Sequence, residues 1–197
     1  FEEGSDVTLL NCNISDNVNI KSDGSKYNTG AGVIAETGAA VLVDGCEFAR
    51  NQASWGAALI LKGDGFFKNN TGNNGPGNSI YLDADAQLLV ENCTFKENTS
   101  NETHGGAFSA SNGSITFRNC TFEDNVQSNK NGAAIRLWNT AHAVLDGCTM
   151  KGNHANYGGA IYLENSAEID IIGGTYDGNY AKGGGLVNAS ASSSRGA

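Results

Sequence analysis

Few residues of this chain occur in a pattern that could do chemistry. Calcium sites need clustered carboxylate oxygens, and the best candidates are Asp83 and Asp85, which share one turn. Asp44 and Asp146 each precede a glycine, as solvated turn residues commonly do. A glycoside hydrolase or a polysaccharide lyase needs its carboxylates gathered on one face, whereas the acidic residues here are scattered. We therefore predict no metal site.

Histidine, serine and cysteine do not indicate a catalytic centre either. Of the three histidines, His104 and His154 share an equivalent position, shortly before a glycine-rich step, and His142 lies elsewhere in its repeat. We expect exposed loop residues at 104 and 154, with a cooperating pair as the alternative. No serine or cysteine has the neighbours of an activated nucleophile. We predict no catalytic residue and no cofactor.

The five cysteines occupy one position of a repeated pattern, at residues 12, 46, 93, 120 and 148. Side chains that face the same way on neighbouring strands rarely reach the dihedral angle of a disulfide. Gly65 and Gly174 occupy the same position in two other copies, which indicates a requirement for small residues. Buried free thiols are expected, with bridges such as Cys12 to Cys46 as the alternative. The absence of a Cys-x-x-Cys pair argues against zinc.

Recognition by aromatic side chains is the chemistry that the pattern supports. A variable gap recurs along the chain, and it contains these candidate binding residues: Tyr27, Trp55, His104, Tyr157 and Tyr180. Such rings can stack on sugars or anchor a protein partner. The alternative is that they cover apolar surface on a side wall of the fold. We predict a protein or glycan partner at this edge.

A repeat positions these residues. A small residue is followed at the second position by a large apolar residue and at the fifth by Asn, about every 27 residues, a period typical of a solenoid. Seven copies align: Cys12/Ile14/Asn17, Cys46/Phe48/Asn51, Gly65/Phe67/Asn70, Cys93/Phe95/Asn98, Cys120/Phe122/Asn125, Cys148/Met150/Asn153 and Gly174/Tyr176/Asn179. We expect Phe48, Phe67, Phe95 and Phe122 to stack inside the fold, and the Asn column to turn a corner and bond along the stack.

The sequence of each repeat predicts that it forms three short strands. Apolar residues alternate with polar ones before the small residue, as at Ile115 and Phe117, and a glycine-rich step leads into another apolar strand, as at Gly158 to Ile161. No helical period is evident. The predicted fold is all-β: a right-handed parallel β-helix of about seven rungs with three short strands each, the hand that parallel crossovers favour. It spans residues 1–188, followed by a Ser/Ala/Gly-rich tail at 189–197. We expect the chain to be part of a longer one.

Composition limits the partners. The net charge is −9, which argues against nucleic acid and anionic membranes. No run of about 18 apolar residues occurs, so no transmembrane segment is predicted. Among the Asn-x-Ser/Thr sequences, Asn101 and Asn112 lie in gaps or turns, and they are the expected glycan sites if the protein is secreted by a eukaryote.

Two alternating motifs carry a resemblance to a known family. Phe-x-x-Asn, as at Phe95 to Asn98, and Gly-Gly-Ala-Ile/Phe, as at Gly105 to Phe108, resemble the polymorphic outer membrane protein repeat over nearly the whole chain. The resemblance implies a pectate-lyase-like superhelix on a cell surface, with adhesion or fibre building as its role.

We therefore expect a non-catalytic structural or adhesive segment, extracellular or at the cell surface. Its unpaired strand edges would permit end-to-end or lateral self-association. A polysaccharide lyase or glycoside hydrolase of the same fold, with its catalytic rungs outside this segment, is the alternative, and a carbohydrate-binding module is another.

Overall fold

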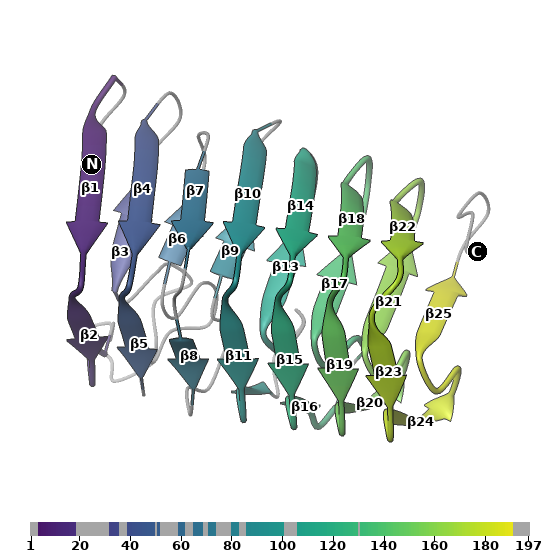
Figure 1. The fold of residues 1–197 in the computed structure, drawn as a ribbon. Helices are drawn as coiled ribbons and strands as arrows, with labels where there is room; N and C mark the ends of the chain where they lie inside the picture. The colour runs from purple at the N-terminus through teal and green to yellow at the C-terminus, as the bar shows by residue number, and fades with distance from the viewer. Residues whose placement is uncertain are drawn as a thin grey trace, which may run out of the picture.

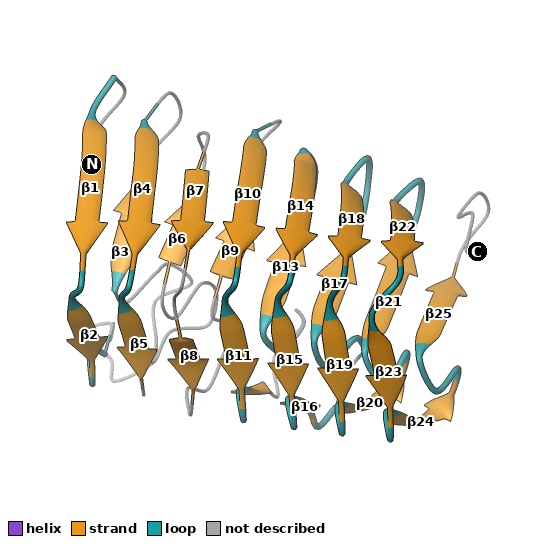
Figure 2. Cartoon of the chain, in the orientation of Figure 1, coloured by secondary structure: helices purple, strands orange, loops and turns teal. Residues whose placement is uncertain are grey.

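The strands of this protein stack side by side along one axis. A computed structural model describes residues 4–18, 32–35, 39–49, 51, 59–61, 65–68, 71–73, 80–82, 86–100, 106–129 and 131–190. Within these residues the regular elements are strands, and no helix occurs (Figure 2). In Figure 1 the chain runs down the near face and up the far face while it advances from left to right, which is the sense of a right-handed coil. The predicted fold class is confirmed.

The near face consists of two parallel sheets of seven strands each (Figure 1). The first sheet contains, in stacking order, β1 (Asp6–Leu10), β4 (Ala40–Asp44), β7 (Gly65–Lys68), β10 (Gln87–Glu91), β14 (Ser114–Arg118), β18 (His142–Asp146) and β22 (Glu168–Ile172). The second contains β2 (Asn13–Ser15), β5 (Glu47–Ala49), β8 (Thr71–Asn73), β11 (Thr94–Lys96), β15 (Thr121–Glu123), β19 (Thr149–Lys151) and β23 (Thr175–Asp177).

The return path contains two further parallel sheets. The third sheet contains β12 (Thr99–Ser100), β16 (Val126–Gln127), β20 (His154–Tyr157) and β24 (Tyr180–Gly183). The fourth contains β3 (Val33–Ala35), β6 (Leu59–Leu61), β9 (Ile80–Leu82), β13 (Phe108–Ala110), β17 (Ile135–Leu137), β21 (Ile161–Glu164) and β25 (Val187–Ser190). Each turn of the coil is called a rung here, so that the first rung contains β1, β2 and β3 and the seventh contains β22 to β25.

In the fourth to seventh rungs, the third sheet adds a strand to the three that the sequence predicts. Its strands lie in the variable gap, where no apolar alternation long enough to indicate a strand occurs in the sequence. Backbone hydrogen bonds between rungs form them nonetheless, for example from Val126 N to Asn98 O at 2.8 Å and from Tyr180 N to Asn153 O at 2.8 Å. At the other boundary, β25 runs past residue 188 because Ala189 and Ser190 pair with Leu163 and Glu164.

The predicted alignment of the third repeat is wrong. The second sheet places Gly72, not Phe67, between Phe48 and Phe95. Phe67 lies instead in the first sheet, in register with Val43 and Val90. The sequence Gly65-x-Phe67 matches the small-x-large motif. Its backbone nevertheless pairs with β4 and β10 of the first sheet, whose strands precede that motif in the other rungs.

The interior is filled by stacked apolar side chains. Phe95 and Phe122 stack with ring centroids 4.8 Å apart and an interplanar angle of 10°. Phe117 of the first sheet meets Phe122 edge to face at 5.3 Å and Phe108 of the fourth sheet at 5.0 Å. The aromatic ladder is therefore confirmed at Phe95 and Phe122.

Within the described residues, two columns of corner residues in the left-handed conformation turn the rungs. They lie directly before the Cys column and directly before the Asn column, as in Asn119 (φ 52°) and Asp124 (φ 52°). The left-handed residue at the second corner is thus the one directly before the ladder Asn, so the turn predicted at the Asn column lies one residue earlier. The side chain of a corner Asn lies over the corner of the next rung: a Cβ on Gly147 would be 2.9 Å from Asn119 Oδ1.

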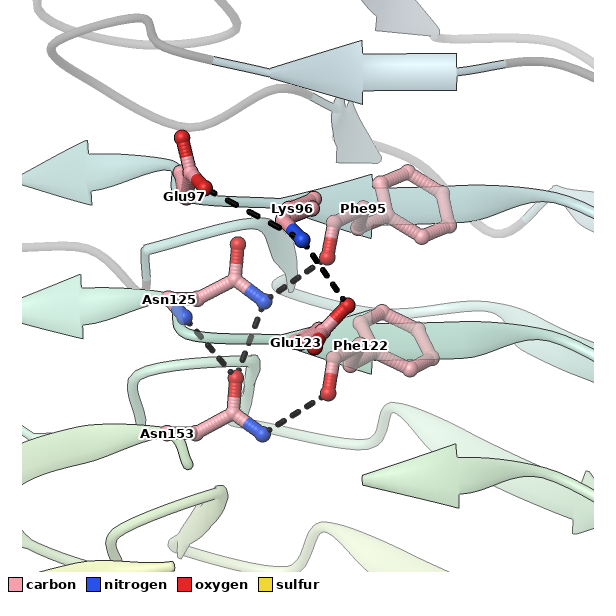
Figure 3. A network of polar contacts seen from close by, with 7 residues as sticks. All are labelled: Phe95, Lys96, Glu97, Phe122, Glu123, Asn125 and Asn153. Atoms are coloured by element: carbon pink, nitrogen blue, oxygen red, sulfur yellow. Dashed lines mark hydrogen bonds and ion pairs between the residues drawn. The ribbon is translucent and has the colours of Figure 1, made fainter. Parts of the chain in front are cut away.

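The Asn column forms a buried hydrogen-bonded ladder along the axis (Figure 3). The side-chain amide of Asn125 donates to Phe95 O and to Asn153 Oδ1, both at 2.9 Å. Its backbone N–H donates to the same oxygen at 3.1 Å. Asn98, Asn125 and Asn153 are at most 1% exposed, so every one of these bonds is shielded from water. The prediction that this column bonds along the stack is confirmed.

The five cysteines are free thiols. Four are buried, and the S–H groups of Cys46, Cys120 and Cys148 donate to backbone carbonyls of the preceding rung, as from Cys120 to Val90 O at 3.3 Å. The structure therefore confirms the prediction of free thiols.

Candidate functional site

The candidate edge is formed by β20 and β24 of the third sheet. Of its five predicted residues, Tyr157 and Tyr180 lie on these two neighbouring strands. Tyr27, Trp55 and His104 lie outside the described residues, as do the candidate glycan site Asn101 and the candidate calcium ligands Asp83 and Asp85.

Register brings a histidine into the edge. His154 is in register with Tyr180, and their rings meet in a T-shaped contact with centroids 4.9 Å apart. Tyr157 is in register with Gly183, where a Cβ would lie 2.8 Å from the tyrosine ring. The absence of a side chain at Gly183 therefore lets the ring of Tyr157 lie flat along the next rung. His154, Tyr157 and Tyr180 are called the aromatic edge below.

Strand alternation places the side chain of His154 outward, because the next residue in β20, Ala155, is 2% exposed and points into the core. Tyr157 lies two residues after Ala155 and departs from this alternation, and it is 51% exposed. Tyr180, in register with His154 on β24, is 59% exposed. The edge can therefore contact a partner without a change in the fold.

Asn112 lies in the turn between β13 and β14 and is half-buried. Its side-chain oxygen accepts a hydrogen bond from Thr140 Oγ1 at 3.0 Å. A glycan is attached through the amide nitrogen, so that hydrogen bond is compatible with modification. Asn98, in another Asn-x-Ser/Thr sequence, is buried in the ladder and is incompatible with a glycan.

The other residues considered for chemistry are dispersed. His142 Nε2 lies 3.0 Å from Asp170 Oδ2 on the exterior of the first sheet, far along the rung from the aromatic edge. Asp146 is 3.6 Å from Arg118 Nε and belongs to a strand rather than a turn, which corrects that part of the sequence interpretation. Among the described residues, no three His, Cys, Asp or Glu side chains gather closely enough to hold a metal ion.

Two thiols of the Cys column, those of Cys46 and Cys120, are held in their protonated form, whereas the hydrogen bond with Cys120 lowers the pKa of Cys148. The neighbouring thiols of Cys148 and Cys93, together with burial, raise the pKa of Cys120. Burial raises the pKa of Cys46. Because the thiolate is the reactive form of cysteine, these side chains act as small apolar residues that fill the corner.

Sequence reasoning missed a cluster on the outer face of the fourth sheet. Tyr81 stacks on Trp138 with centroids 5.9 Å apart, and the guanidinium of Arg136 lies 5.1 Å from the centre of the Trp138 ring. Arg136 also pairs with Glu164 at 2.6 Å. Aligning the fourth-sheet strands Ile80-Tyr81-Leu82, Ile135-Arg136-Leu137 and Ile161-Tyr162-Leu163 would have shown one outward column.

Columns of alternating charge on the near face were also missed. In the first sheet, the last position of successive strands carries opposite charges at Glu91, Arg118 and Asp146. In the second sheet the same alternation occurs over Lys96, Glu123, Lys151 and Asp177. Lys96 Nζ is 3.2 Å from Glu123, and this hydrogen bond raises the pKa of Lys96.

These features define a parallel β-helix protein with a filled interior, paired exterior charges and one exposed aromatic edge. The sequence profile of the right-handed beta helix region matches residues 1–150, and the chain belongs to that family. No curated protein and no solved structure matches the chain. Among the described residues, no helix has the length and apolar character needed to cross a membrane.

Proposed function

We propose that this protein is a non-catalytic structural or adhesive element, extracellular or at a cell surface, that presents its aromatic edge to a protein or glycan partner. The observation that carries the proposal is the pair of half-exposed tyrosines on neighbouring rungs, with His154 packed against one of them. Aromatic residues of this kind dominate binding energy at interfaces because they bury large areas at low entropic cost.

Two further observations support a structural role. The amide ladder and the axial ion pairs bind rung to rung, which favours a rigid rod. The resemblance of the repeat to that of polymorphic outer membrane proteins favours a surface location and adhesion. The buried thiols of Cys46 and Cys120 have a raised pKa, which favours their protonated, less reactive form.

Binding measurements on a Tyr157 variant test the proposal. Immobilised pectin and alginate, and cultured cells as a source of surface proteins, serve as probes, and bound protein is quantified by fluorescence. Tyr157→Ala is expected to weaken binding about 30-fold, the effect of losing one aromatic anchor of about 2 kcal/mol. Thr121→Ala, on the near face, is the matched control and should bind as the wild type does.

Two results would contradict the proposal. Equal binding of the Tyr157→Ala variant and the wild type would mean that the aromatic edge does not bind the partner. Release of uronic acid from pectin or alginate by the wild type would establish an enzyme instead.

A further inference from the structure

The repeat places an Asn-x-Thr sequence at one corner of the coil. In the fourth and fifth rungs the corner residue is Asn, the small residue is Cys and the first outward residue of the next strand is Thr, as in Asn92-Cys93-Thr94 and Asn119-Cys120-Thr121. The two threonines pair in register on β11 and β15. Asn two residues before Thr is the acceptor sequence for an N-linked glycan, which needs a position on the protein surface.

The other asparagines of such sequences within the described ranges are poorly placed to carry a glycan, which is attached through the amide nitrogen. Asn98 is 1% exposed, and its amide belongs to the buried ladder. Asn13 and Asn112 donate from Nδ2 to neighbouring side chains, at 3.2 and 3.5 Å. Asn112 and Asn188 are half-buried. Each of these sites would have to give up a contact or its shielding from water.

Asn92 and Asn119 differ from them in both exposure and bonding. Both are exposed. Their backbone N–H groups donate to the next rung, to Arg118 O at 3.0 Å and to Asp146 O at 2.9 Å respectively. Among the described residues, neither side-chain amide has a hydrogen-bond partner. Each amide nitrogen can therefore form a new bond without the loss of a contact in the fold.

The corners that follow Asn119 along the axis are bare. They are Gly147 and Gly173. A Cβ placed on Gly147 would lie 2.9 Å from Asn119 Oδ1 and within 4 Å of no other described atom outside its chain neighbours, so Asn119 Nδ2 lies farther from that corner. A Cβ on Gly173 would meet no described atom within 4 Å. The corner after Asn92, by contrast, carries the side chain of Asn119, about 4.8 Å along the axis.

We propose that Asn119 is the acceptor of an N-linked glycan when the chain passes through a glycosylating secretory pathway. The inference rests on the extracellular or cell-surface location in the proposed function. In the transfer, Nδ2 of Asn119 bonds to the anomeric carbon of an oligosaccharide carried on a lipid diphosphate. The bond between that carbon and the phosphate oxygen breaks, and the proton lost by Nδ2 leaves with the diphosphate. No atom is oxidised or reduced, and the Thr121 hydroxyl completes the recognised sequence.

A glycan at this position leaves the aromatic edge accessible. Asn119 lies between β14 and β15 on the near face, whereas β20 and β24 lie on the return path (Figure 1). The glycan would cover the part of the near face where Arg118 pairs with Glu91 and Asp146. The partner-binding side and the glycan-bearing side of the coil are therefore different.

Mass spectrometry of the secreted protein tests this site. The chain is produced behind a cleavable secretion signal in cultured animal cells, and secreted and retained protein are analysed separately. Enzymatic release of glycans in water enriched in heavy oxygen converts each occupied Asn to a labelled Asp. Most secreted molecules should be labelled at Asn119 and fewer at Asn92, and Asn98 should be unlabelled in the secreted fraction. An unlabelled Asn119, or a higher occupancy of Asn92 than of Asn119, would overturn the proposal.

Two substitutions of Thr121 form a matched pair of variants. Thr121→Val keeps Asn119 and the shape of residue 121 but removes the hydroxyl, and it should abolish the label at residue 119. Thr121→Ser keeps the hydroxyl and should retain the label. Asn119→Gly, which gives this corner the residue found at Gly147, should remove the same glycan. Circular dichroism verifies that the variants fold. A label at 119 in Thr121→Val, or its loss in a folded Thr121→Ser, would contradict the assignment.

Failure of this proposal can be separated from failure of the proposed function. Binding by Tyr157→Ala is measured on protein made in bacteria that do not N-glycosylate, so its outcome does not depend on Asn119. An unlabelled Asn119 together with weakened binding by Tyr157→Ala would overturn the glycan site alone. A labelled Asn119 together with unchanged binding by Tyr157→Ala would overturn the aromatic edge alone.

Discussion

Phe122 is the residue on which the interior packing of the middle rungs converges. It stacks on Phe95 and meets Phe117 edge to face, and it is fully buried. Phe122→Ala should lower the free energy of unfolding by about 3 to 5 kcal/mol, because it removes both contacts and leaves a cavity. Urea unfolding followed by circular dichroism measures this. Thr121→Ala, one residue away on the outer surface, should change stability by less than about 1 kcal/mol.

Tyr176 occupies the ladder position that is Phe in three other rungs, and its hydroxyl is buried without a hydrogen-bond partner among the described residues. Tyr176→Phe should therefore be neutral or stabilise the protein by about 1 kcal/mol, because it removes an unsatisfied polar group. Loss of stability in this variant would mean that the hydroxyl has a partner in solution.

The same hydroxyl gives the protein a dependence on high pH. Burial raises the pKa of Tyr176 from 10.0 to about 12. Between these values the unfolded chain loses the proton and the folded chain keeps it, so the free energy of unfolding falls as pH rises from 10 to 12 and is unaffected by this group below pH 10. Unfolding measurements across this interval should show a smaller fall for Tyr176→Phe than for the wild type. Equal slopes would contradict the assignment.

At the scale of elements, the amide ladder joins the second and third sheets of each rung. Asn125→Ala removes two donors and leaves the backbone N–H and side-chain amide of Asn98 without their buried acceptor. We expect a loss of about 3 to 5 kcal/mol in urea unfolding, since several buried polar groups lose their partners together. Asn13→Ala, at an exposed position of β2, is the control and should cost less than about 1 kcal/mol.

The left-handed corners predict a coupling between rungs. Gly147 has φ of 63° and lies beneath the side chain of Asn119. Gly147→Ala should cost about 1 to 2 kcal/mol from the conformation alone, and more from the overlap with Asn119 Oδ1. In a double-mutant cycle, Asn119→Gly should remove the overlap and show a coupling of about 0.5 kcal/mol or more. Additive effects would mean that the two corners do not touch.

The strands that sequence predicted correctly are those with apolar alternation of their own. The first-sheet strand at Ser114–Arg118 has two inward residues flanked by polar ones, so its period is visible. The third-sheet strands have no such pattern, because β16 is only two residues long and is held by backbone bonds between rungs. The predicted register of the third repeat was wrong for a related reason. Gly65-x-Phe67 matches the small-x-large motif in the sequence, and only the pairing with neighbouring rungs shows that Phe67 belongs to the first sheet and that Gly72 occupies the ladder position.

At the scale of the whole molecule, the period of the repeat was sufficient to predict the fold but only part of the surface. Tyr157 and Tyr180 were identified because they are aromatic residues in a variable gap. The charge columns and the Arg136 cluster arise between repeats that lie next to each other only after folding. Their detection requires the residues to be compared column by column.

The direction of the backbone hydrogen bonds sets how this rod responds to mechanical force. Because the strands run across the axis and their bonds run along it, tension applied between the two ends loads these bonds one rung at a time, as in a zipper, rather than all together in shear. From β10 onward the strands of the first sheet repeat every 26 to 28 residues, so each of these rungs releases roughly 90 Å of extended chain when it opens. Under a pull along its length this part of the protein would thus yield one rung at a time, in steps of similar length, and act as an extensible tether.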